Sequence, residues 1–394
     1  MVSSFMHLTK RQLLQTTGYA LLGSAAPYAL ALPQRTLVFP RDYGAHPDFR
    51  TEWWYITGHA KNSAGREFGF QVTFFRSRVD AAQSMQSKFA AKQLIFAHCA
   101  ITDVQGKKLW HDQRIAREGF GIAQASLDNT DIKLGSWSLK RTARIISASI
   151  DDYEAPPIRY QAHIQTKDFA LDVSFTQTQA VLLQGQQGLS RKGPDEKQAS
   201  YYYSVPQLQA DGNITLQGNA FAIQGTAWLD HEWSQELLHP EAVGWDWIGM
   251  NLFDGSALTA FQLRRKDGSA LWTGGSFRAP GPIVKPTVNL PINLANAAPT
   301  MGQTFNHQAG DVQFTGSKPW TSPANGAKYP TEWLVRTPAK IYTVKAVIPN
   351  QELSGHSATG TVYWEGLSDL FDSSGKHVGR GYLEMTGYAG ALRI

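Results

Sequence analysis

Residues 69–74 have the sequence Gly-Phe-Gln-Val-Thr-Phe, in which large apolar side chains recur at every second position. Successive side chains of an extended strand point to opposite faces, so Phe70, Val72 and Phe74 lie on one face. Residues 257–263, Ala-Leu-Thr-Ala-Phe-Gln-Leu, behave similarly. The alternation predicts half-buried β-strands in both halves of the chain.

Turn signals separate the strand-like runs. Asp-Gly dipeptides lie between such runs at 211–212, 254–255 and 267–268. Glycine supplies the positive φ of a tight hairpin turn, so we expect each dipeptide to join two antiparallel strands. Helical periodicity is scarce, and residues 80–92 are the best candidate for a short helix or a lid between strands. These features predict an all-β fold, a sandwich or a barrel, rather than alternating strands and helices.

The length and composition of the chain predict two domains built from sheets. The chain has 394 residues, more than one hydrophobic core usually organises. We place the boundary near residue 240, between an N-terminal domain over residues 32–240 and a C-terminal domain over residues 241–394. The sequence Thr-Glu-Trp occurs at 51–53 and again at 331–333, which adds weak support for a duplication. Aromatic residues make up 11% of the chain and charged residues only 18%, which suits sheets around apolar cavities.

The first 31 residues have the pattern of a signal peptide. Lys10 and Arg11 precede a mildly apolar stretch over 17–26, and Ala-Leu-Ala at 29–31 has the small-x-small shape of a cleavage site. The basic pair resembles a twin-arginine signal with lysine in place of the first arginine, so the export route stays open between this and the general secretory route. The apolar stretch falls short of the ~20 residues of a spanning helix. We therefore expect a periplasmic or secreted protein that begins near Leu32 and has no membrane span after processing.

Charge, cysteine content and missing motifs argue against several classes of protein. Removal of Lys10 and Arg11 lowers the formal net charge from +5 to +3, and no basic run remains that would suggest a nucleic acid partner. The single Cys99 lies in an apolar run and is expected to be buried and inert. The sequence has no nucleophile elbow, zinc-protease motif, phosphate-binding loop or dinucleotide fingerprint. We predict no cofactor.

The densest group of ionisable and aromatic side chains lies at 228–233, Trp-Leu-Asp-His-Glu-Trp. On a strand, Asp230 and Glu232 face one side, and His231 faces the other side together with Trp233. An imidazole beside an indole can exchange a proton near neutral pH and stabilise a nearby cation. We predict catalytic roles for Asp230, His231 and Glu232. For the two acids, capping of loops or backbone amides where the domains meet is an equal alternative.

Other aromatic clusters provide candidates for substrate binding. Alternation over residues 50–59 places Glu52 and Trp54 on one side and Trp53 and Tyr55 on the other, where these aromatics either contact substrate or plug a barrel end. The segments 201–204, 364–366 and 381–388 carry tyrosines, or an acid beside aromatics. The predicted substrate-binding residues are Trp54, Tyr202, Trp233, Trp245, Asp246, Trp247 and Tyr382.

Metal binding is the less favoured interpretation of the ionisable residues. Asp230, His231, Glu232 and His239 have side chains that can ligate metals. Neighbouring side chains on a strand diverge, so few of the four could reach one ion. We predict no metal site.

Several blocks of sequence, taken together and in order, resemble a known family. These blocks are residues 50–55, 68–76, 96–98, 201–204, 225–233, 245–247, 364–366 and 381–387. They are similar to the AttH/carotenoid 1,2-hydratase family, which is also called predicted secreted hydrolases or hydroxyneurosporene synthase-like. The resemblance implies two tandem lipocalin-like (calycin-type) β-barrels with a cavity near their junction. Because the hydratases usually carry Asp-His-Asn where this chain has Asp-His-Glu at 230–232, the resemblance is closer to the AttH-type branch.

The resemblance and the residues together give two main functional hypotheses. Characterised relatives hydrate the terminal double bond of acyclic carotenoids without a cofactor, and fungal relatives guide pericyclic cyclisations. The first hypothesis is cofactor-independent hydration or isomerisation of an apolar isoprenoid or lipid-like molecule, as a hydro-lyase. His231 or Asp230 would supply the proton, and the cation would be flanked by Trp233, Trp245 and Tyr202.

The second hypothesis follows from relatives that accompany ABC-transporter genes. It is a non-catalytic periplasmic lipid-binding component of an AttH-type ABC transport system, with the transporter permease as partner. A hydrolase is the third choice, because no credible nucleophile–base pair is present.

Overall fold

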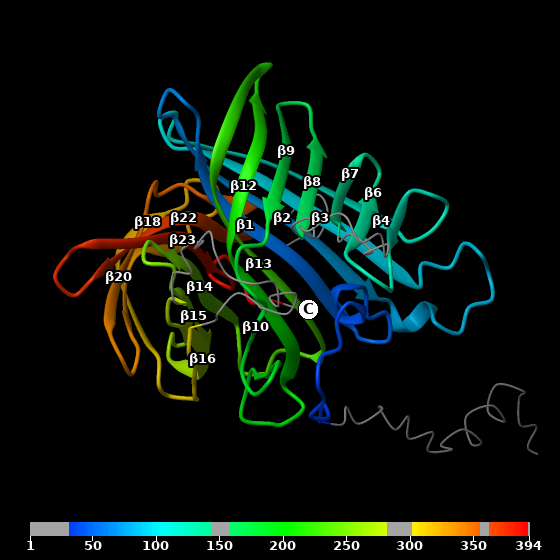
Figure 1. The fold of residues 1–394 in the computed structure, drawn as a ribbon. Coiled ribbons are helices and arrows are strands. Elements are labelled where there is room, and N and C mark those ends of the chain that lie inside the picture. The colour runs from blue at the N-terminus through cyan, green and yellow to red at the C-terminus, as the bar shows by residue number, and fades with distance from the viewer. Residues whose placement is uncertain (1–30, 143–157, 282–301, 355–361, 393–394) are drawn as a thin grey trace, which may run out of the picture. The chain divides into compact units, whose positions relative to one another are not determined.

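The computed structural model describes residues 31–142, 158–281, 302–354 and 362–392, and these residues form an all-β protein (Figure 1). Helical structure within these ranges is limited to two three-residue 3-10 helices, Arg41–Tyr43 and Asp80–Ala82. No helix in the same ranges is long and apolar enough to cross a membrane. Residues 1–30, which hold nearly all of the predicted signal peptide, lie outside the described residues.

The first sheet contains thirteen of the described strands. They are β1 (Thr51–Lys61), β2 (Glu67–Arg78), β3 (Gln93–Asp103), β4 (Lys108–Arg117), β5 (Ala123–Ala125), β6 (Asp131–Leu134), β7 (Trp137–Thr142), β8 (Arg159–Gln165), β9 (Phe169–Thr176), β10 (Leu182–Leu183), β11 (Leu189–Arg191), β12 (Ala199–Leu216) and β13 (Asn219–Glu236). Their order is β4-β3-β2-β1-β13-β12-β9-β8-β7-β6-β5, and β10 and β11 also pair with β12. All neighbouring pairs are antiparallel.

This sheet curls into a lipocalin-like barrel around its own apolar core. Arg114 of β4 donates hydrogen bonds to Ser136 Oγ at 2.9 Å and to the Gln165 carbonyl at 2.8 Å, which brings opposite edges of the sheet together. The inward-facing side chains alternate along each strand, as the period-two pattern predicts; Phe70, Val72 and Phe74 are all fully buried in this core.

The second sheet contains ten described strands and has a core of its own. They are β14 (Gly244–Leu252), β15 (Ala257–Arg264), β16 (Ala270–Arg278), β17 (Thr304–His307), β18 (Gln313–Thr321), β19 (Lys328–Arg336), β20 (Ile341–Ala346), β21 (Glu352–Ser354), β22 (Val362–Asp372) and β23 (His377–Met385). Their order is β17-β16-β15-β14-β23-β22-β20-β19-β18, with β21 paired to β22. The sheet curls around a core that includes Ile248, Tyr329 and Trp364.

A third apolar cluster lies between the two sheets. It joins Tyr55 and Trp228, from the outer face of the first sheet, to Trp247, Phe261 and Tyr382 of the second. The two sheets therefore meet along β1 and β13 on one side and β14, β15 and β23 on the other (Figure 1). We call this region the inter-sheet layer. It consists of the side chains on the facing sides of the two sheets, among them Tyr55, Trp228, Trp247, Phe261 and Tyr382.

Two of the three predicted Asp-Gly turns are confirmed, and one is wrong. Residues 254–255 and 267–268 lie in the turns between β14 and β15 and between β15 and β16. Residues 211–212 lie inside β12 instead, and the chain reverses at Gln217 and Gly218, both with positive φ. Gly212 is needed for close packing, because an added Cβ would lie 2.2 Å from the carbonyl oxygen of Asp172 on β9.

The candidate helix over residues 80–92 is also largely wrong. Only Asp80–Ala82 is helical, and the rest of the segment is turn and irregular structure. The expectation for Cys99 is confirmed, since its side chain is fully buried in the first core.

Candidate functional site

Strand β13 carries the predicted catalytic residues on both of its faces. His231 and Trp233 point into the first barrel, while Asp230 and Glu232 point outward, Asp230 beside Trp228 of the inter-sheet cluster. The alternation predicted for residues 228–233 is therefore confirmed. It divides the predicted site into two clusters that lie on opposite sides of the same sheet.

His231 belongs to a buried network inside the first barrel. Its Nε2 lies 2.9 Å from Glu52 Oε1, and its Nδ1 lies 3.0 Å from the Tyr203 hydroxyl. Glu52 also contacts His46 Nδ1 at 2.7 Å and accepts a hydrogen bond from Arg76 Nε at 2.7 Å. We call His46, Glu52, Arg76 and His231 the barrel network.

The barrel network holds a negative charge in place. Burial alone would raise the pKa of Glu52, but hydrogen bonds from His231 and His46 hold it well below its usual range. Burial lowers the pKa of His231 to about 4, although Glu52 opposes this change. Two predicted substrate-binding residues serve as walls here, because Trp54 stacks on His231 and Trp233 stacks on His46 at a centroid distance of 3.8 Å.

The barrel network also contains a set of potential metal ligands. Ligand atoms of His46, Glu52 and His231 lie within 4.8 Å of one another. Glu52 already accepts hydrogen bonds from both histidines and pairs with Arg76, and all four side chains are at most 5% exposed. A divalent ion would add two positive charges beside the Arg76 guanidinium in a site shielded from water. Two histidines and a glutamate are donors that zinc can use, but here Glu52 is engaged by the Arg76 guanidinium and by both histidines in a hydrogen-bonded ion pair.

Asp230 occupies the inter-sheet layer and is held by three donors. Its Oδ1 accepts hydrogen bonds from Ser204 Oγ and from Trp228 Nε1 at 2.7 Å, and its Oδ2 accepts one from the Tyr202 hydroxyl at 2.9 Å. Burial raises the pKa of Asp230 to about 7 even though these donors favour its charged form. The carboxyl is therefore fixed in position and keeps its proton to a higher pH than an ordinary aspartate.

Two further carboxyl groups face the same layer from the second sheet. Glu365 on β22 lies directly opposite Glu384 on β23, and both are buried. Burial and the charge of Glu384 raise the pKa of Glu365 well above its usual range. Burial raises the pKa of Glu384 to about 7, and the nearby Asp230 and Glu232 contribute to the rise. No lysine or arginine among the described residues forms an ion pair with either glutamate, so both carboxyls keep their protons to a higher pH than an exposed glutamate.

Several buried polar side chains of the layer contact each other. Tyr55 interacts with Glu365, and Gln71 interacts with Tyr363. His98 Nε2 has no hydrogen-bond partner among the described residues. Buried polar groups normally find partners, so this atom is typical of a place where water binds.

The third predicted acid, Glu232, is paired. Its Oε1 lies 3.0 Å from Lys192 Nζ and accepts a hydrogen bond from Ser200. The Lys192 ammonium also lies over the rings of Tyr202 and Phe261. Glu232 therefore fixes a cation at the edge of the layer.

The predicted substrate-binding residues of the second half also divide between two faces. Trp245 and Trp247 face the inter-sheet layer, where Trp247 Nε1 lies 3.3 Å from the Tyr202 hydroxyl, and Tyr382 lies in the same cluster. Asp246 points to the other face of β14 and forms an ion pair with Arg264 at 2.8 Å. Asp246 is thus separated from the tryptophans that flank it.

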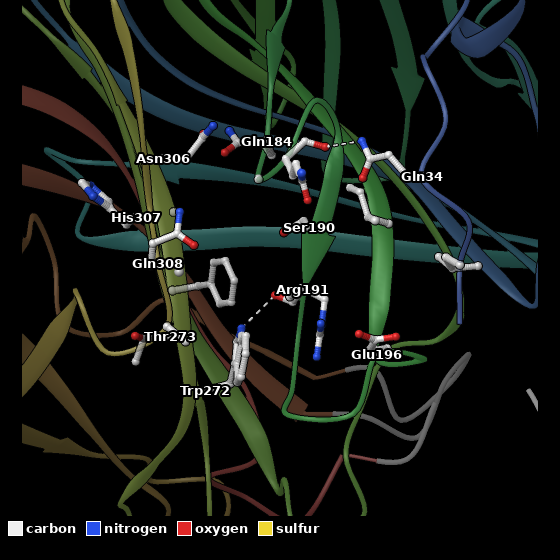
Figure 2. Close-up of a pocket in the computed structure, with 18 of the residues that line it drawn as sticks. Gln34, Gln184, Ser190, Arg191, Glu196, Trp272, Thr273, Asn306, His307 and Gln308 are labelled. Carbon is white, nitrogen blue, oxygen red and sulfur yellow. Dashed lines mark hydrogen bonds between the residues drawn. The ribbon is translucent and has the colours of Figure 1, made fainter. Parts of the chain in front are cut away.

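A cavity of about 660 Å³ adjoins the layer (Figure 2). Its lining includes Gln184 and Phe261. Gln184 Nε2 donates a hydrogen bond to Ser204 Oγ at 2.8 Å, and Ser204 in turn donates to Asp230. The cavity is therefore joined to Asp230 by two hydrogen bonds.

The sequence interpretation missed several residues of this layer. Glu365 and Glu384 had a signal, an acid beside aromatic residues, but no sign that the two lie opposite each other. Lys192 and Gln184 had no such signal. Both lie beside short strands, and the sequence of a short strand does not predict which part of the protein it packs against.

The fold and the site together describe an all-β protein of two lipocalin-like sheets with a buried acidic layer between them. The AttH-like family matches residues 30–388, and the chain belongs to this family. Among solved structures, a candidate AttH protein from Nitrosomonas europaea shares 41% sequence identity over 91% of this chain and 99% of its own, with a TM-score of 0.76. No curated protein matches the chain.

A more distant structure shows the same fold. Kievitone hydratase from Nectria haematococca shares 13% identity over 90% of this chain and 94% of its own, with a TM-score of 0.63. At this identity, the similarity concerns the arrangement of the strands.

Proposed function

We propose that the chain carries out cofactor-independent acid–base chemistry, hydration or isomerisation, on an apolar isoprenoid or lipid-like molecule. The observation that carries the proposal is Asp230, a buried carboxyl with a pKa raised to about 7 and an orientation fixed by three donors. A group whose pKa lies near the working pH both gives and accepts protons efficiently. Membership of the AttH-like family and the fold shared with a hydratase support this choice.

The carboxyl groups of the layer can serve the two proton transfers of a hydration, which are protonation of the alkene and removal of a proton from the attacking water. The protonated Asp230 gives its proton to one alkene carbon, which leaves a positive charge on the other carbon. Water then forms the new C–O bond, and the proton that it loses passes to a carboxylate, so alkene and water give an alcohol. Glu384, with a pKa of about 7, is a second group that can take up this proton. In an isomerisation, the cation instead loses a proton from a neighbouring carbon.

Aromatic side chains of the layer suit a cationic intermediate. Tyr202 donates a hydrogen bond to Asp230, and Trp247 contacts Tyr202. Trp245 packs against the same cluster and interacts with Glu384. The electron-rich face of an aromatic ring attracts a cation. Burial raises the pKa of Tyr202 well above its usual range, so its hydroxyl stays protonated. Asp230 is a better proton donor to this place than His231, because the imidazole points into the opposite core.

A non-catalytic lipid-binding component of an AttH-type ABC transport system is the second candidate function. The cavity of about 660 Å³ favours it, because a carrier needs a cavity and no proton donor. Periplasmic location and a permease partner belong to this candidate as proposals.

The substitution Asp230→Asn tests the catalytic proposal. Geraniol, an isoprenoid alkene with ten carbons, is incubated with the protein in heavy water, and mass spectrometry measures deuterium bound to carbon. Proton transfer to the alkene puts deuterium on carbon in both hydration and isomerisation. Loss of the acid should reduce the rate by about 10²–10⁴-fold, the usual share of general acid–base catalysis.

The matched control is Asp103→Asn, which replaces another buried aspartate that pairs with Arg66 at the end of β3. This variant should keep the rate. Equal rates for Asp230→Asn and the unmodified protein would contradict the catalytic role of Asp230. Binding of geraniol without any deuterium uptake would favour the carrier.

A further inference from the structure

The cavity beside the inter-sheet layer has a polar lining that the proposed chemistry does not require. It lies between the β10–β11 segment and residues 31–34 on one side and strands β15, β16 and β17 on the other (Figure 2). Five carboxamide side chains line it: Gln34, Gln184, Gln186, Asn306 and Gln308. Each carboxamide offers both donors and acceptors. A ligand with hydroxyl groups satisfies such a lining, because a hydroxyl also donates and accepts.

The formal charges of the cavity balance. Arg191 and Glu196 both line it and carry opposite charges. The third ionisable group is His307, and burial lowers its pKa, so the ring is neutral near pH 7. An anionic or cationic head group would therefore meet no excess of opposite charge.

Apolar side chains complete the lining and adjoin the acid site. Phe261 and Trp272 form one wall, and Trp272 Nε1 donates a hydrogen bond to the Arg191 carbonyl at 3.0 Å, which fixes the indole (Figure 2). Phe261 also belongs to the apolar cluster between the sheets. Phe261 therefore borders both the cavity and the inter-sheet layer, and the Lys192 ammonium lies over its ring and that of Tyr202.

Gln184 joins the polar lining to Asp230. Its Oε1 accepts a hydrogen bond from Ser276 Oγ at 2.8 Å, which orients the amide so that Nε2 donates to Ser204 Oγ. Ser204 donates to Asp230. Gln184 also donates to Thr259 Oγ1, so its amide is fully engaged and fixes this wall of the cavity relative to the acid.

We propose that this cavity binds a neutral, hydroxyl-bearing head group, so that the substrate is an oxygenated isoprenoid rather than a hydrocarbon. This inference rests on the proposed function and names its substrate class. Gln186, Asn306 and Gln308 are exposed, and a hydrocarbon seated against them would displace water without replacing its hydrogen bonds, whereas a hydroxyl replaces them. Sites built to hydrogen-bond a hydroxyl reject analogues that lack it for this reason.

Binding of three ten-carbon probes tests the proposal without turnover. The probes are geraniol, which carries a hydroxyl, myrcene, a hydrocarbon of the same size, and geranyl phosphate, which is charged. Calorimetry should give geraniol an affinity about tenfold higher than myrcene, the effect of one or two hydrogen bonds. Geranyl phosphate should gain nothing over geraniol.

The double substitution Asn306→Leu with Gln308→Leu locates the head group. It should lower the affinity for geraniol to that for myrcene and leave myrcene binding unchanged or stronger. The control is Gln124→Leu, an exposed residue of β5 outside the cavity, which should change neither affinity.

Failure of this inference can be told apart from failure of the proposed function. Myrcene binding as tightly as geraniol, or no binding of either probe, overturns the head-group proposal. If myrcene also takes up deuterium through Asp230, the acid–base chemistry stands and only the substrate class is wrong. If geraniol binds as expected but takes up no deuterium, the cavity assignment stands and the catalytic proposal fails.

Discussion

The two clusters on opposite faces of β13 differ in how the protein handles ionisable groups. On the inner face, Glu52 contacts Arg76 and two histidines, and its pKa is held well below the usual range. On the outer face, the pKa values of Asp230 and Glu384 are both raised to about 7. No arginine or lysine of the described chain forms an ion pair with either of these two acids. The barrel network holds a charge, whereas Asp230 and Glu384 in the inter-sheet layer keep their protons to a higher pH than ordinary carboxyls.

Strand β13 contributes to the stability of the fold through one face and to the proposed chemistry through the other. Asp230 and His231 are adjacent in sequence, yet they belong to different clusters because successive side chains point to opposite faces. Charges that are paired in the native state stabilise the fold, and unpaired buried carboxyls reduce its stability at neutral pH. Substitutions on the two faces should therefore have opposite effects on stability.

The largest effect on stability is expected from Glu52→Gln in the barrel network. The substitution leaves the buried Arg76 guanidinium without its counter-charge, and breaking a buried ion pair in this way costs about 3–5 kcal/mol. Because the folded pKa of Glu52 lies well below its ordinary value of 4.5, its charge contributes fully to stability above pH 4.5, and this contribution is lost progressively as the pH falls from there through the folded pKa. Urea unfolding followed by tryptophan fluorescence should show a large difference from the unmodified protein at pH 7 and only a slightly smaller one at pH 4.

The control is Glu332→Gln, which breaks exposed pairs with Lys318 and Lys345. Surface pairs are worth about 0–1 kcal/mol, so this variant should stay close to the unmodified protein. A loss for Glu52→Gln no larger than that of the control would contradict the role given to the barrel network.

His231→Gln should have a smaller effect, about 1–3 kcal/mol of stability. Glutamine keeps a donor for Glu52 but loses the ring that stacks on Trp54 at a centroid distance of 4.5 Å. Since the side chain is fully buried and faces away from the inter-sheet layer, deuterium uptake from heavy water should fall less than tenfold. A fall of 10²–10⁴-fold, with the fold intact, would instead support the catalytic role predicted for His231 from the sequence.

The all-β fold and the sharing of faces could be predicted from local patterns in the sequence. Alternation over residues 228–233 was enough to pair Asp230 with Glu232 and His231 with Trp233. The turns at 254–255 and 267–268 were also local signals. The turn predicted at residues 211–212 is wrong because glycine also occurs inside strands, where its missing side chain allows a neighbouring strand to pack closely.

What each face meets could not be predicted, because the contacts are distant in sequence. Glu52 lies 179 residues from His231, and Glu384 comes from the other sheet. No local sequence pattern predicts whether Trp245 and Trp247 pack against the side of β13 that carries Asp230 or the side that carries His231. The sequence interpretation grouped Trp233 with Trp245 and Tyr202 around one cation, but the structure places Trp233 in the first core and Tyr202 and Trp245 on the other side of that sheet.

An effect of the opposite sign is expected from Glu384→Gln in the inter-sheet layer. The pKa of Glu384 rises from 4.5 to about 7 on folding, so between these values the folded state binds more protons than the unfolded state. Stability contributed by this group is therefore lost as the pH rises through that window. Glutamine stays neutral, so the variant should be more stable than the unmodified protein at pH 8, by up to about 3 kcal/mol, and closer to it in stability at pH 5.

Unfolding measured in urea at both pH values checks this sign against Glu52→Gln, which should be less stable than the unmodified protein at pH 8. If Glu384→Gln were destabilising at pH 8, the Glu384 carboxylate would have a stabilising partner, and the raised pKa of Glu384 would be wrong. The gain in stability should also come with slower deuterium uptake, because the variant loses a group that accepts the proton released by water. Stability gained by removing a group that the chemistry uses is the trade-off expected of an active site, and it would separate a catalytic layer from one that only binds.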